Sequence, residues 1–86
     1  FRFRESGWQE TSRPAELLED RLLRERLGAV ETAWWRRDGE VLYLALPLAE
    51  DRPFPLETLF CLARPERVEG WPCAVYAFRR GEPVPP

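Results

Sequence analysis

Two segments of this chain are apolar on both sides, and they are the strongest structural signal in the sequence. Residues 41–46 read Val-Leu-Tyr-Leu-Ala-Leu, and residues 73–79 read Cys-Ala-Val-Tyr-Ala-Phe-Arg. A strand with one wet face alternates apolar and polar residues, whereas a strand that is apolar throughout is covered on both faces. We therefore expect both segments to be buried strands.

The dipeptide Asp38-Gly39 precedes the first of these strands and is a strong hairpin signal. With these two residues as the turn, Trp34 lies opposite Tyr43. Opposed residues share a side of the sheet, so this register sorts the hairpin into two faces. One face carries Ala33, Trp35, Leu42, Leu44 and Leu46, and the other carries Thr32, Trp34, Arg36, Val41, Tyr43 and Ala45. We expect the helices to cover the leucine side.

Helical spacing is present in two other stretches. Ser12 and Pro14 are typical of a helix start, and apolar residues recur on one side of 14–27. A second, shorter helix is expected over 56–63. A turn through Glu69-Gly70 then leads to the last strand.

The segment Phe1–Arg4 alternates apolar and charged residues, as a half-buried strand does. The order is then strand, helix, strand, strand, helix, strand. This order predicts a ferredoxin-like βαββαβ fold of the α+β class, a two-layer sandwich in which a four-stranded antiparallel sheet carries two helices on one face. We assign 1–80 to a single α+β domain and 81–86 to a proline-rich, loosely ordered tail. Without the first strand, the alternative is a three-stranded α+β sandwich.

This topology leaves one sheet face without helices, and the register places aromatic residues there. An uncovered apolar face is typical of an interaction site. We predict an interface formed by Phe3, Trp34, Arg36, Tyr43 and Tyr76. The favoured function is a non-catalytic module that homodimerises or docks a protein partner through this face, since Trp, Tyr and Arg are common at such interfaces.

The residue types that the chain lacks exclude several chemistries. It has no His and no Lys, and all thirteen basic residues are Arg. This composition excludes Ser–His and Cys–His nucleophile pairs, Schiff-base chemistry and a P-loop lysine. Two cysteines without histidine do not form a structural zinc site, and the isolated glycines form no phosphate loop. The sequence therefore predicts no metal and no cofactor, and favours a non-catalytic protein over an enzyme.

The remaining reactive groups have ordinary structural interpretations. The acidic pairs Glu50-Asp51 and Glu66 with Glu69 are typical of solvated loop charges, because a catalytic acid needs burial to shift its pKa. Cys61 and Cys73 can form one bridge, but free buried thiols are more common in a small intracellular domain. We expect Cys73 to be an inert core residue.

Arginine next to aromatic residues on strands also suggests a single-stranded nucleic-acid binder that uses the same sheet face. The net charge of −2 and the pI of about 5.2 disfavour that partner, because nucleic-acid surfaces need a basic excess. A second alternative is a small ligand-binding protein or enzyme with its pocket at a dimer interface.

No apolar run approaches the length of a membrane span, and no signal segment is present, so we expect a cytoplasmic protein without a membrane partner. The missing Lys, Asn, Ile and Met have AT-rich codons, which indicates a GC-rich genome. Few Asn and many prolines are also compatible with a thermophilic source.

Overall fold

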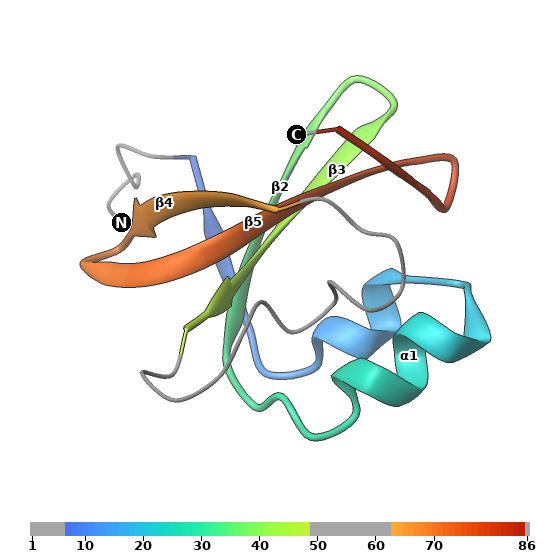
Figure 1. Cartoon of the computed structure of the whole chain (residues 1–86), viewed down its shortest axis with the longest axis horizontal. Helices are drawn as coiled ribbons and strands as arrows, with labels where there is room; N and C mark the ends of the chain where they lie inside the picture. Colours follow the sequence, from blue (N-terminus) through green and yellow to red (C-terminus); the bar gives the residue numbers. More distant parts are fainter. Residues whose placement is uncertain (1–6, 49–62, 86) are drawn as a thin grey trace.

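The described part of the chain forms one antiparallel sheet of six strands with a helical segment on one face (Figure 1). The structure is a computed structural model that describes residues 7–48 and 63–85. The strands are β1 (Gln9–Thr11), β2 (Ala33–Asp38), β3 (Val41–Pro47), β4 (Arg64–Val68), β5 (Trp71–Arg79) and β6 (Glu82–Val84). Their order is β1-β2-β3-β5-β4, and β6 pairs with β5 on the edge that faces away from β3.

The predicted ferredoxin-like fold, with four strands and two helices, is wrong, and the three-stranded alternative is wrong too. Both missed β4 and β6, which two-residue turns join to β5. Glu69 and Gly70 have φ values of 51° and 86°, and Arg80 and Gly81 have values of 52° and 82°. Positive φ at both central residues is typical of a type I′ turn, whose twist suits a hairpin. The stretch predicted as a loosely ordered tail therefore contains β6.

Proline made β4 and β6 difficult to predict from the sequence, because a proline within a segment argues against a strand. Pro65 pairs with Ala74, and Pro83 pairs with Phe78. The pair that closes each two-residue hairpin is hydrogen-bonded, and such pairs alternate with non-bonded ones along an antiparallel ladder. Both prolines therefore turn their nitrogen away from β5, where the missing N–H breaks no ladder bond. Edge strands with proline also resist pairing with a further strand.

The predicted helix over 14–27 is broken into two pieces. A 3-10 helix, η1 (Pro14–Leu17), precedes the α-helix α1 (Arg21–Leu27). Between them the Asp20 carboxylate accepts a hydrogen bond from the Leu23 N–H at 3.1 Å. An aspartate that caps the next turn competes with a helix that continues through it, so α1 starts after Asp20.

The predicted strand Phe1–Arg4 lies outside the described residues, and so does the predicted helix 56–63 except for Ala63, which is in no helix. In the structure, the strand that pairs with the outer side of β2 is β1.

The β2–β3 hairpin turns one residue later than the sequence suggested. Gly39 and Glu40 form the turn, since Asp38 pairs with Val41. Gly39 has φ 61°, whereas Glu40 is not among the residues with positive φ, and this combination is typical of a type II′ turn. Trp34 consequently lies opposite Ala45 rather than Tyr43. The shift is two residues along β3, and because side chains alternate with a period of two, both predicted faces keep their members.

Each face of the sheet is covered by its own buried cluster. The helix-side core contains Leu18, Leu23, Leu27, Ala33, Leu42, Leu44, Leu46, Ala74, Tyr76 and Phe78. The second core contains Trp8, Trp34, Ala45, Val68, Cys73 and Val75, with Tyr43 packed against it. This arrangement confirms that 41–46 and 73–79 are strands covered on both faces, and that the helical segment covers the leucine side.

The second core is closed because the sheet is strongly curled. Trp8 precedes β1 at one edge of the sheet, and Val68 ends β4 at the other edge, yet both belong to the second core. Figure 1 shows the β4–β5 pair running steeply across the β2–β3 pair. The face predicted to lie open is therefore largely covered by the chain itself.

Candidate functional site

An arginine held between two aromatic rings lies at the margin of the second core. The guanidinium carbon of Arg36 is 4.3 Å from the centroid of the Tyr43 ring and 5.1 Å from that of a Trp8 ring. Tyr43 is the direct partner of Arg36 across the β2–β3 ladder. Gln9 pairs with Trp35, and extending this β1–β2 register by one residue places Trp8 opposite Arg36. We call Trp8, Arg36 and Tyr43 the arginine stack.

The arginine stack holds a partly desolvated cation. Among the ten arginines that the structure describes, Arg36 alone is half-buried and the other nine are exposed. Both rings lie within the distance at which a cation is attracted to a π-face, an interaction worth about 0.5–2 kcal/mol according to exposure. Its guanidinium forms no hydrogen bond or ion pair within the described part of the chain. No described residue therefore occupies its N–H groups.

The structure brings together only some of the predicted interface residues. Arg36 and Tyr43 are in contact, as just described. Trp34 is 3% exposed inside the second core, and its indole Nε1 has no hydrogen-bond partner among the described residues. Tyr76 pairs with Leu44 and is 1% exposed in the helix-side core, so it lies on the opposite face of the sheet. Phe3 lies outside the described residues.

Sequence reasoning missed two exposed or contacting tryptophans. Trp8 falls between the predicted strand Phe1–Arg4 and the predicted helix over 14–27, and only the β1–β2 register reveals that it lies beside Arg36. Trp71 begins β5 on the same side of the sheet as Cys73 and is 58% exposed. Its spacing of two from Cys73 was the available signal, but the strand was expected to begin only at residue 73.

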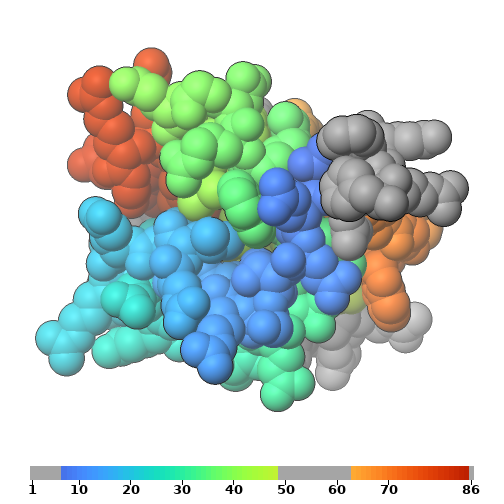
Figure 2. Space-filling view, turned by 180° about the vertical axis from the view of Figure 1, so that it is seen from behind, coloured from blue at the N-terminus to red at the C-terminus, as the bar shows by residue number. Residues whose placement is uncertain are grey.

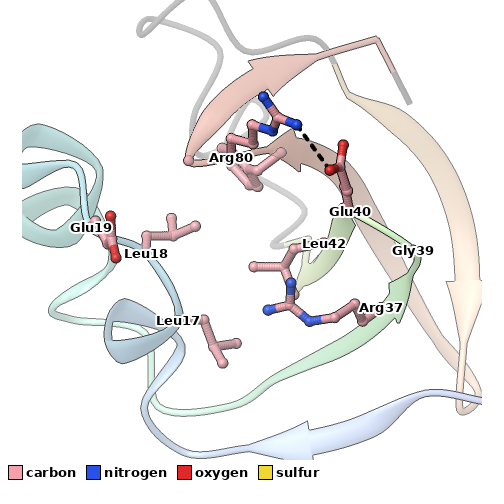
Figure 3. Close-up of a pocket in the computed structure, with 10 residues that line it drawn as sticks. Leu17, Leu18, Glu19, Arg37, Gly39, Glu40, Leu42 and Arg80 are labelled. Carbon is pink, nitrogen blue, oxygen red and sulfur yellow. Dashed lines mark hydrogen bonds and ion pairs between the residues drawn. The ribbon is translucent and has the colours of Figure 1, made fainter.

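A groove of about 560 Å³ lies on the other side of the sheet, between the helical segment and two hairpin tips. Figure 2 shows its two sides, with the light-blue and cyan helical segment below and the green and red hairpins above. In Figure 3, Arg37 and Leu42 point from the sheet toward Leu17 and Leu18.

The charges that line this groove are balanced. Glu40 accepts from Arg80 at 3.0 Å, and Arg79 also pairs with Glu40, at 3.4 Å. The lining contributes two arginines, Arg37 and Arg80, and two glutamates, Glu19 and Glu40. The groove therefore offers no excess of either charge, and the arginine stack is the more selective chemical feature.

Cys73 has the properties of an inert thiol. It is free and fully buried in the second core. Burial raises its pKa to about 11; the Glu66 carboxylate raises it further, and a hydrogen bond with the Val68 backbone lowers it. The thiolate, which is the reactive form, is therefore scarce at neutral pH. Cys61 and the pair Glu50-Asp51 lie outside the described residues.

Metal ligands do not gather anywhere in residues 7–48 and 63–85, where no three His, Cys, Asp or Glu side chains are placed to share an ion. Glu66, a candidate carboxylate in the sequence, pairs instead with Arg64 at 3.1 Å. Within the same residues, no helix has the length and apolar character needed to cross a bilayer.

Comparisons with known proteins add no relative. No protein-family model matches the chain, and neither a curated protein nor a solved structure matches it. The arginine stack is therefore the feature of the molecule that points to a function.

Proposed function

We propose that this chain is a small, non-catalytic interaction module that docks a segment of a partner protein over the arginine stack. The observation that carries the proposal is the half-buried Arg36 guanidinium, which lies between Trp8 and Tyr43 and whose N–H groups bond to no described residue. Trp, Tyr and Arg are the residue types that contribute most binding energy at protein interfaces. A side chain that is already fixed loses less entropy when a partner binds.

A separate partner fits this surface better than a second copy of the chain. A stable dimer buries about 800 Å² on each chain, with an apolar centre. The large hydrophobic residues exposed in the described part are Leu22 and Trp71 alone, and they come from different layers of the fold. Pro65 and Pro83 also disfavour dimers that form by adding strands at the β4 and β6 edges.

Nucleic acid is the weaker alternative for the same residues. Stacking of bases requires free aromatic faces. In the arginine stack, the Arg36 guanidinium already lies over one face of Tyr43 and over Trp8. The net charge of −2 also gives no general attraction to phosphates.

The test is a selection of displayed random dodecapeptides on the wild-type protein, followed by affinity measurements on substituted proteins. We expect enriched peptides to bind Arg36→Gln at least tenfold more weakly than wild type. Arg37→Gln is the matched control, because Arg37 is the next residue, loses the same charge and faces the opposite side of the sheet. Peptides that bind both variants as well as wild type would place the docking surface elsewhere.

Light scattering over a concentration series tests the choice of partner. We expect the mass of one chain, 10.1 kDa, at every concentration. A mass near twice that value, lost in Arg36→Gln but kept in Arg37→Gln, would show that the surface serves self-association instead.

A further inference from the structure

We infer that the docked segment presents a single carboxylate, from an Asp or Glu side chain, to the in-plane edge of the Arg36 guanidinium. This inference deepens the proposed function and depends on it for the identity of the partner. The carboxylate site itself is a property of this chain and is testable separately.

Two aromatic rings limit how a ligand can approach Arg36. A guanidinium is flat, and its five N–H groups lie in its plane. The guanidinium carbon of Arg36 lies over the Tyr43 ring and over the Trp8 ring, at 4.3 Å and 5.1 Å from their centroids, and the two rings come from opposite sides of β2. The rings flank Arg36 on two sides, so we expect a ligand to approach along the guanidinium plane, where parallel N–H groups match the two oxygens of a carboxylate.

The other arginines differ from Arg36 in partners and exposure. Five of them form ion pairs with glutamates, and Arg67 donates to the Gly70 carbonyl at 2.8 Å. Arg24, Arg26 and Arg37 have no such partner among the described residues, but water surrounds them. Arg36 combines partial burial with N–H donors that no described residue uses, so a carboxylate that reaches it gains a stronger, less screened bond than at an exposed arginine.

Two acidic neighbours set the charge of the ligand. Glu10 pairs with Trp34, and Asp38 lies two residues after Arg36, so both carboxylates belong to the same sheet face as Arg36. Neither lies within ion-pair distance of it. Because they repel further negative charge, a singly charged carboxylate is favoured over a phosphate, which carries up to two charges.

The experiment is an NMR titration of the protein with sodium acetate, at constant ionic strength maintained with chloride. The Arg36 Nε–H and Trp8 indole N–H signals are followed, and the Arg37 Nε–H signal is the internal control. We expect the Arg36 shift to saturate at an acetate concentration at least threefold lower than the Arg37 shift. The Trp8 response should vanish in Arg36→Lys, which keeps the charge but lacks the fork, and persist in Arg37→Lys.

Equal, unsaturated shifts at Arg36 and Arg37 would overturn the carboxylate site. A tighter response to inorganic phosphate than to acetate would overturn the assignment of a carboxylate. These outcomes are separate from failure of the proposed function, which is a loss of Arg36 dependence among the selected peptides. Amide spectra of both lysine variants show whether each is folded.

Discussion

The contact between Arg36 and Tyr43 gives a prediction whose magnitude follows from the structure. The guanidinium carbon lies 4.3 Å from the ring centroid, and both side chains are half-buried. Cation–π contacts range from about 0.5–1 kcal/mol at exposed sites to about 2 kcal/mol when desolvated. We therefore expect a coupling free energy of about 1 kcal/mol in a double-mutant cycle that combines Arg36→Gln with Tyr43→Leu.

Urea unfolding of wild type, both single variants and the double variant measures this coupling. A change of 1 kcal/mol moves the midpoint by roughly 0.5–1 M urea for a small protein. The control cycle combines Arg37→Gln with Tyr43→Leu, since Arg37 is on the other face, and its coupling should stay below about 0.5 kcal/mol. Equal couplings in the two cycles would refute the idea that the stack fixes Arg36.

Three further predictions concern the fold and the buried thiol. Asp20→Ala should lower the free energy of unfolding by about 1 kcal/mol, because the cap at the start of α1 is lost; no change in urea unfolding would contradict the break before α1. Gly39→Ala should lower the free energy of unfolding by about 1 kcal/mol, because Gly39 has φ 61°, which alanine adopts only with strain. An added Cβ would contact no atom within 4 Å, so the backbone conformation alone sets this loss. An unchanged urea midpoint would argue against the observed turn. For Cys73, burial raises the pKa of the thiol from its ordinary value of about 9.0 to about 11, so the folded state keeps the thiol proton up to a higher pH than the unfolded state does. Stability should therefore fall by up to about 3 kcal/mol between pH 9 and 11, and Cys73→Ala should remove this part of the pH dependence; identical pH profiles would contradict it.

Periodicity in the sequence was sufficient to identify the two central strands and their faces. Runs such as 41–46 are apolar on both sides, and the structure covers them on both sides. The predicted faces of the hairpin are correct although the predicted turn is not, because the observed register differs by two residues, which is one full period of a strand. The alternation of side chains along each strand was therefore enough to predict which hairpin residues share a face of the sheet.

The sheet edges were not predictable in the same way. Proline within β4 and β6 removed the usual strand signal, and the turns Glu69-Gly70 and Arg80-Gly81 place a charged residue at positive φ. Glu and Arg are not the residues normally expected at such positions. The curl that closes the second core is a tertiary property, because it brings together Trp8 and Val68 from opposite edges of the sheet.

The candidate site was likewise predictable only in part. Arg36 and Tyr43 share a predicted face, and the structure places them in contact. Trp34 shares that face too, but curling of the sheet buries it. The side of the sheet on which Tyr76 lies depends on the β3–β5 register, which the sequence did not specify. In the structure Tyr76 lies in the helix-side core.

The most direct test of the account is the affinity of one selected peptide, measured by fluorescence anisotropy, for wild type, Arg36→Gln and Arg37→Gln. The account predicts a loss of at least tenfold for Arg36→Gln and less than twofold for Arg37→Gln. Equal losses for the two variants, or no loss for either, would contradict the claim that the arginine stack is the docking surface.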